Sequence, residues 1–265
     1  MKWMIYPRSG VTKRAFTLIE LIFVILLLGI LSGVVYEKIS KSNNLQEVTD
    51  QLLRHIRYTQ HLAMIDDVYI GKPSQSEYSN SVTAKNDAKF WYKKRWQIVF
   101  HFQNTAPAGY REYYYSIFRD IPWNTATGNF DRRVNGPEDI ESYKKIAKDS
   151  YDDKYLTGSN WSDDQPNYSP NMNLKEYYGC YIDTSVARSK YGIAWNSSMR
   201  ILFDKKGSPH YHYISDTTSE SGYTYLMKDG DDFLIRVFCG DGQSNYICIR
   251  PITGFISQVN DPSEC

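Results

Sequence analysis

The sequence predicts an α+β protein in which a long N-terminal helix packs on an antiparallel β-sheet. An unbroken apolar run at residues 16–36 and an amphipathic pattern at residues 45–63 together predict the helix. Short apolar and aromatic runs, separated by turn residues, recur from residue 96 onward and predict the sheet. The 265 residues are enough for one sizeable domain or two small ones.

Charge is unevenly distributed along the chain. The formal net charge is +1, yet the first fifteen residues contain only basic charges, at Lys2, Arg8, Lys13 and Arg14. Without these four, 27 basic residues stand against 30 acidic ones. Binding nucleic acid through bulk charge needs a clustered excess of basic residues, so the composition argues against that class of protein. The composition does not exclude a local basic patch.

The apolar run at residues 16–36 predicts a membrane-spanning helix. Its 21 residues would extend for about 31 Å as a helix, which is enough to cross a bilayer. The basic flank places residues 1–15 in the cytoplasm and the chain after Lys38 outside. Because the run is longer than that of a cleaved signal peptide, the helix is expected to be retained.

Glu20 is the single charged residue in this apolar run. A lone carboxylate at the centre of a membrane helix costs about 2.5–3.5 kcal/mol on insertion scales, and such residues are functional candidates. We therefore expect Glu20 to have a cationic partner.

The residues from Arg14 to Glu20, RAFTLIE, followed by an apolar run containing Gly29, resemble the class III signal of type IV prepilins and pseudopilins. The resemblance implies that prepilin peptidase cleaves between Ala15 and Phe16 and that the new amino group of Phe16 is methylated. It also implies that Glu20 neutralises the amino group of a neighbouring subunit during assembly. The family usually has Gly before the cut, and since Ala15 is also small, we expect equal or slower processing.

The absence of a helix-kinking proline distinguishes this chain from many major pilins. Many major pilins have a helix-kinking proline just beyond the apolar core, where this chain has Glu37, and no proline lies between Phe16 and Lys72. Together with the size of the chain, this resembles the minor pseudopilins of the GspH/FimT class.

An amphipathic pattern follows a polar joint at residues 40–44 and predicts that the helix continues to about residue 66. The predicted apolar stripe consists of Leu45, Val48, Leu52, Ile56 and Ala63, widened by Leu53 and Met64. The opposite face carries Gln46, Asp50, Arg54, Arg57 and Gln60. One side of this segment can therefore lie on a sheet.

Seven runs are predicted to be antiparallel strands: 96–102, 110–118, 199–204, 209–214, 232–239, 245–252 and 254–259. The first two form a predicted hairpin around Pro107 and Gly109. The phrases FDKKGSP and IRPITGFIS loosely resemble the C-terminal sheets of GspH/FimT-like pseudopilins.

The expected organisation is a cleaved leader at 1–15, a pilin helix at 16–66 and a β-rich periplasmic domain at 67–265, interrupted by a polar insertion at about 122–178. Within the insertion, a short helix is predicted at 138–148, after Pro137, and a surface loop at 157–173.

Four cysteines, Cys180, Cys239, Cys248 and Cys265, follow the export-type segment, and their even number indicates oxidation outside the cytoplasm. Cys239 and Cys248 flank a short turn, which favours a bond between them and leaves Cys180 to pair with Cys265. The two other connectivities stay open.

Other candidate chemistry has ordinary structural explanations. Carboxylates at 229–232, Asp241 and 149–153 could bind calcium, but none matches a twelve-residue calcium loop, and turn formation explains them equally well. His210 and His212 share a strand face without an evident third metal ligand. Trp91, Tyr92, Trp96 and Tyr113–Tyr115 could stack on sugars or bases, although aromatic residues are common in strands.

No catalytic motif is present, so the sequence predicts a non-enzymatic subunit of a type II secretion or type IV pilus-like filament, in a single-pass topology in the inner membrane. The expected partners are prepilin peptidase, other pilins or pseudopilins through the N-terminal helix, the inner-membrane assembly platform and the lipid bilayer. The alternative is a pilus-tip adhesin or DNA-uptake receptor with its binding site in residues 70–180. DNA or a secreted substrate could then be a further partner.

Overall fold

The computed structural model describes residues 18–66, 95–103, 111–119, 146–158, 168–194, 198–211, 225–228, 230, 232–240 and 242–265, with the side chains of 31–43, 225 and 226 outside this description. The chain divides into two compact units, Met1–Lys41 and Ser42–Cys265. The boundary falls within the polar joint expected at residues 40–44.

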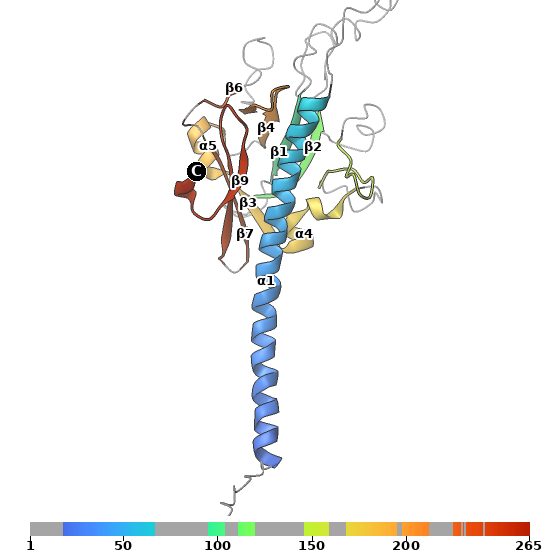
Figure 1. Ribbon diagram of the computed structural model, residues 1–265, viewed down its shortest axis with the longest axis vertical. Coiled ribbons are helices and arrows are strands. Elements are labelled where there is room, and N and C mark those ends of the chain that lie inside the picture. Colours follow the sequence, from blue (N-terminus) through green and yellow to red (C-terminus); the bar gives the residue numbers. More distant parts are fainter. Residues whose placement is uncertain are drawn as a thin grey trace, which may run out of the picture. The chain divides into compact units, whose positions relative to one another are not determined.

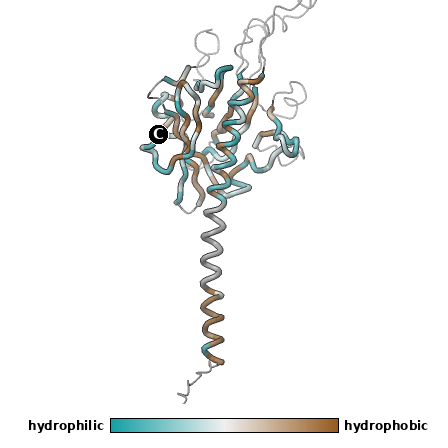
Figure 2. The backbone as a smooth tube through the Cα atoms, viewed as in Figure 1, coloured by the Kyte–Doolittle hydropathy of each residue, from teal (hydrophilic) through white to brown (hydrophobic). Residues whose placement is uncertain are grey.

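Helix α1 extends over Leu18–Ile65, close to the expected 16–66. Figure 2 shows the first turns as apolar, and their large side chains are exposed: Leu18, Ile19, Leu21, Ile22, Phe23, Val24, Ile25, Leu26, Leu27, Leu28 and Ile30. Within the residues that the structure describes, no helix is both long and apolar enough to cross a membrane. The predicted span at 16–36 lies partly outside those residues and stays a prediction.

The second unit contains an antiparallel sheet, which confirms the α+β class (Figure 1). Nine strands are found in the described residues, in the order β6-β5-β4-β1-β2-β3-β7-β8-β9. Their bounds are Trp96–Phe102 (β1), Glu112–Arg119 (β2), Cys180–Asp183 (β3), Met199–Phe203 (β4), Pro209–Tyr211 (β5), Tyr225–Leu226 (β6), Phe233–Cys239 (β7), Ser244–Ile249 (β8) and Ile256–Val259 (β9). Short helices are η3 (Pro170–Met172), α4 (Leu174–Tyr178), α5 (Ser185–Tyr191) and η4 (Pro262–Glu264).

The second half of α1 lies along this sheet and supplies one side of the core (Figure 1). All five residues of the predicted central stripe are buried, namely Leu45, Val48, Leu52, Ile56 and Ala63. Full burial of a side chain such as Leu52 or Ile56 stabilises the fold by about 1.5–3 kcal/mol. Leu53 is half-buried as expected, but Met64 is 53% exposed, so its placement in the stripe was wrong.

The predicted hairpin of β1 and β2 is confirmed, with Trp96 opposite Arg119 and Phe100 opposite Tyr115. A bulge at the end where the chain connects the two strands pairs Phe102 with Glu112 and His101 with Tyr114, which leaves Tyr113 as the extra residue. The structure adds two strands that the sequence did not predict, β3 and β6.

Parts of the supposed polar insertion belong to the folded body. Residues Ile146 and Lys148 form isolated β-bridges with Phe118 and Tyr155, so the predicted helix at 138–148 is wrong for residues 146–148. Residues 138–145 lie outside the described residues. Tyr168 and Met172 are buried, which also corrects the surface-loop prediction at the end of 157–173. The apolar residues of this segment are separated by long polar stretches, so they form no periodic pattern in the sequence.

All four cysteines are in disulfides, but the predicted pairing was wrong. The bonds join Cys180 to Cys239 and Cys248 to Cys265. The reason is the register: Cys180 on β3 lies directly opposite Cys239 on β7, whereas Cys248 on β8 lies opposite Leu234. Cys239 and Cys248 are therefore kept apart along the β7–β8 hairpin.

Candidate functional site

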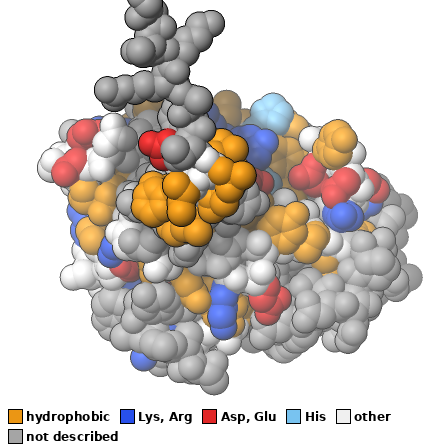
Figure 3. All heavy atoms as spheres, turned by 90° about the horizontal axis from the view of Figure 1, so that it is seen from below, with side chains coloured by type: hydrophobic (Ala, Val, Ile, Leu, Met, Phe, Trp, Pro, Cys, Tyr) orange, Lys and Arg blue, Asp and Glu red, His pale blue; other side chains and the backbone are white. Residues whose placement is uncertain are grey.

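The expected processing and assembly residues lie at the start of the chain. Ala15 and Phe16 are outside the described residues, and Glu20 lies exposed in the first turn of α1. An acidic residue there is favoured by the positive end of the helix dipole. Figure 3, viewed from below, shows apolar side chains gathered in the foreground. The first turns of α1 thus combine one carboxylate with a continuous apolar surface.

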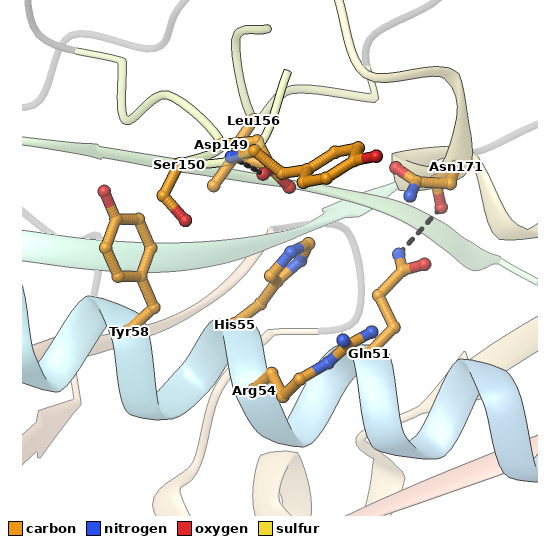
Figure 4. A pocket seen from close by; sticks show the side chains of 9 residues that line it. Gln51, Arg54, His55, Tyr58, Asp149, Ser150, Leu156 and Asn171 are labelled. Atoms are coloured by element: carbon orange, nitrogen blue, oxygen red, sulfur yellow. Dashed lines mark hydrogen bonds between the residues drawn. The ribbon is translucent and has the colours of Figure 1, made fainter. Parts of the chain in front are cut away.

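A pocket of about 450 Å³ forms a second candidate site, between α1 and the turn at residues 149–151 (Figure 4). The helix contributes Gln51, Arg54, His55 and Tyr58. The facing wall consists of Asp149, Ser150, Tyr151, Leu156 and Asn171. Residues that are distant in sequence therefore meet here, such as Gln51 and Asn171, which are 120 positions apart.

A chain of hydrogen bonds supports the floor of this pocket. The Tyr178 hydroxyl donates to Gln51 Oε1 at 2.8 Å, and Gln51 Nε2 donates to the Tyr115 hydroxyl at 2.8 Å and to the Asn171 carbonyl at 2.9 Å. The Tyr115 hydroxyl lies 2.8 Å from His55 Nδ1. Because the side chains hold one another, the orientation of His55 is fixed by buried groups.

Burial keeps His55 neutral. It lowers the pKa of His55 from its ordinary 6.5 to about 4, partly opposed by the carboxylate of Asp149 and assisted by Arg54. Burial also raises the pKa of Tyr115, whose phenol is completely inaccessible. Both groups are thus uncharged hydrogen-bonding groups at neutral pH.

The charged residues of the turn that covers the pocket pair with one another or bond to the backbone of the same turn. Lys148 pairs with Asp153 at 2.8 Å and Lys154 with Asp152 at 3.2 Å, while Asp149 Oδ1 accepts the Tyr151 amide at 2.7 Å. No group of three potential metal ligands occurs in the part of the chain that the structure describes. The other predicted calcium candidates, Asp229, Asp231 and Asp241, lie outside that part, and Asp232 pairs with Arg250 at 3.3 Å.

The remaining predicted candidates are not brought into one site. His210 Nε2 lies 3.4 Å from Asp204 Oδ2, and His212 is outside the described residues, as are Trp91 and Tyr92. The predicted aromatic group also divides between two faces of the sheet. Tyr115 is in the core beneath α1, whereas the ring of Tyr113 stacks edge-on against Tyr181 at 6.3 Å.

A buried ion pair between Glu112 and Arg188 was missed by the sequence analysis. The Arg188 guanidinium bonds to Glu112, which also accepts from the amide and hydroxyl of Thr184 at 3.1 and 2.6 Å. Burial raises the pKa of Glu112, against the opposing effects of Arg188 and Thr184. Removing one partner of such a pair costs about 3–5 kcal/mol. The pair fixes α5 to β2, and nothing in the local sequence pattern signals it.

Comparison with known proteins gives one match. Residues 12–36 match the family described as prokaryotic N-terminal methylation motif. No curated protein and no solved structure gives a significant match. The chain thus has a prepilin-type methylation motif ahead of a helix packed on an antiparallel sheet, which is a pilin-like arrangement.

Proposed function

We propose that this chain is a minor pseudopilin or pilin subunit of the GspH/FimT class, assembled into a type II secretion or type IV pilus-like filament. The observation that carries the proposal is the match of residues 12–36 to the methylation motif, because that segment contains the FTLIE string and the last two basic residues of the leader, Lys13 and Arg14. Pilin-like proteins are generally non-enzymatic structural subunits, and the proposal assigns no catalytic residue.

The exposed apolar surface of α1 supports insertion followed by assembly. Eleven large apolar side chains between Leu18 and Ile30 are at least 43% exposed. Burying each of them fully would gain about 1.5–3 kcal/mol, so this surface requires a lipid or protein environment. We propose the inner membrane before assembly, with the N-terminus cytoplasmic and the domain periplasmic, and the helices of neighbouring subunits afterwards.

Glu20 has a specific place in this scheme. Once prepilin peptidase has cut between Ala15 and Phe16, the Phe16 amine of one subunit can pair with the Glu20 carboxylate of another. Pairing would offset the cost of placing a carboxylate in an apolar environment. The assembly platform would then add the subunit to the filament.

N-terminal sequencing of the protein extracted from membranes tests the processing step. The expected result is a chain beginning at methylated Phe16, with a slower or blocked cut when Ala15 is replaced by Leu. Ala15→Gly serves as the matched control and should be processed at least as fast as the parent chain. An intact Met1 terminus, or a cut elsewhere, would contradict the proposed processing.

A further inference from the structure

The pocket between α1 and residues 149–151 is of a size suited to a small ligand. Its volume of about 450 Å³ lies within the range of about 300–1,000 Å³ that is typical of ligand sites. One or two sugar rings fit such a space. Figure 4 shows His55 and Tyr58 extending from the helix toward Asp149 and Ser150, and Gln51 toward Asn171.

The helix wall of this pocket offers hydrogen-bond donors. Both hydrogens of Gln51 Nε2 are used within the protein, by the Tyr115 hydroxyl at 2.8 Å and the Asn171 carbonyl at 2.9 Å, whereas His55 Nδ1 lies 2.8 Å from the Tyr115 hydroxyl and can accept its proton. A neutral His55 that accepts at Nδ1 carries its proton at Nε2. Arg54 makes no hydrogen bond or ion pair with the described residues, and its guanidinium adds further donors.

The facing wall offers acceptors. Asn171 Oδ1 is buried and has no hydrogen-bond partner among the described residues. The Asn171 backbone carbonyl is already occupied by Gln51 at 2.9 Å, so the side-chain oxygen is a separate acceptor. Asp149 Oδ1 accepts the Tyr151 amide, which leaves the second carboxylate oxygen for a ligand. Buried acceptors normally have a partner, and a ligand hydroxyl would supply one.

Aromatic rings lie at the edge of the pocket. Tyr151 is 98% exposed at the tip of the turn, although its ring is large and mostly apolar. Tyr58 is half-buried, and its hydroxyl is held by the Lys148 carbonyl at 3.1 Å. The flat faces of such rings can pack on the C–H groups of a ligand.

We propose that this pocket binds a neutral carbohydrate of one or two sugar units. A hydroxyl group both donates and accepts, so a polyol can satisfy donors on one wall and acceptors on the other. Asp149 disfavours an anionic ligand, and Arg54 disfavours a cationic one. The inference is independent of the filament to which the chain is assigned.

Saturation-transfer NMR on the full chain tests the proposal, with a sugar-free zwitterionic detergent to avoid competition from detergent headgroups. The probes are maltose, cellobiose, lactose and N,N′-diacetylchitobiose, each at about 10 mM, where a Kd near 1 mM is readily seen. At least one disaccharide should show saturation transfer from the protein. Tyr151→Ala should then weaken its binding about tenfold, which is the loss expected from one stacked ring.

Two further variants make the result specific. Asn171→Ala should also weaken binding, whereas Phe255→Ala, which removes an aromatic side chain that is 61% exposed outside the pocket, should leave binding unchanged. Absence of transfer to all four sugars would overturn the proposal. So would undiminished binding by Tyr151→Ala, or displacement of the sugar by inorganic phosphate, which would identify an anion site instead.

Discussion

The side-chain amide of Gln60 donates to the carbonyl oxygen of Gly207 at 2.8 Å. The same nitrogen lies 3.0 Å from the carbonyl oxygen of Gly254. Gly207 lies in the turn between β4 and β5, and Gly254 in the turn between β8 and β9. These two strand pairs are far apart in the order of the sheet, yet their turns meet on α1. Gln60 thus joins the helix to both sides of the sheet.

The contact between the two turns predicts that Gly254→Ala destabilises the protein strongly. A Cβ at position 254 would lie 2.2 Å from the Gly207 carbonyl oxygen, and φ is +65° there. The left-handed conformation alone costs a non-glycine residue about 1–2 kcal/mol, and the backbone clash adds to that. We expect the free energy of unfolding, measured by urea denaturation, to fall by more than about 2 kcal/mol.

Gly192→Ala is the matched control for this substitution. Gly192 has the same φ of +65°, but a Cβ there would meet nothing within 4 Å. Its loss of stability should be limited to the conformational cost of about 1–2 kcal/mol. Equal losses of unfolding free energy for the two variants would mean that separating the two turns does not destabilise the protein.

The disulfide connectivity predicts unequal losses when each bond is removed. Cys180–Cys239 closes a loop of 59 residues, and Cys248–Cys265 one of 17. In the chain-entropy account, replacing both cysteines of a pair by Ser should cost about 4 kcal/mol for the first bond and about 3 kcal/mol for the second. Denaturant unfolding of the two double variants measures this.

Peptide mapping under non-reducing conditions checks the pairing itself. It should recover Cys180 joined to Cys239 and Cys248 joined to Cys265. A bond between Cys239 and Cys248 would contradict the β3–β7 and β7–β8 registers and hence the order of the sheet.

Local patterns predicted the elements that are long and regular, and missed those set by distant partners. Strand β1 was predicted at its observed bounds, because seven consecutive residues alternate or are apolar. Strand β3 was missed because its four residues, CYID, have only two core positions, Cys180 and Ile182. Without β3 there was no register to bring Cys180 beside Cys239, and the disulfide error followed.

The pocket could not be predicted from the sequence, because it too depends on contacts between segments that are distant in the chain. Asp149 was noticed only as a possible cation ligand, and His55 was not noticed at all, since single polar residues on a helix are common. Their proximity depends on the β-bridges of Lys148 with Tyr155 and of Thr157 with Ser116, which hold the turn over α1. Such pairings between short, irregular segments leave no periodic signal.

The buried His55 predicts a loss of stability at mildly acidic pH. In the unfolded chain His55 takes up a proton near pH 6.5, whereas in the folded protein the pKa is about 4. Between these values the unfolded state binds more protons, so the free energy of unfolding falls as pH falls. The loss should approach about 3 kcal/mol at pH 4, because each pKa unit corresponds to about 1.4 kcal/mol.

Comparison with His55→Gln isolates this effect from the other titrating groups. Tyr115, Asp149 and Arg54 face His55 and are retained in the variant. The difference in unfolding free energy between the two proteins, measured by urea denaturation from pH 7.5 to pH 4, should change in favour of His55→Gln as pH falls. A difference that is independent of pH would mean that folding does not lower the pKa of His55.

The last prediction concerns Glu20, which we expect to act in assembly and not in folding of the domain. Glu20→Val removes the charge from the apolar run, so membrane insertion should be undiminished. The two disulfides, which lie in the second unit, should also form normally. Processing at Phe16 should persist, whereas co-assembly with other subunits should be lost, because the Phe16 amine of a neighbour would have no carboxylate to pair with.

A photo-crosslinking residue at Leu26, which is 56% exposed on α1, provides the measurement. Crosslinks to other filament subunits in the membrane should be strong in the parent chain and weak in Glu20→Val at equal abundance of processed protein. Glu20→Asp keeps the carboxylate and should retain a substantial part of the crosslinking. If Glu20→Val crosslinks as strongly as the parent chain, and secretion or pilus-dependent uptake is intact, the apolar surface between Leu18 and Ile30 drives packing by itself. The ion pair would then have no part in assembly.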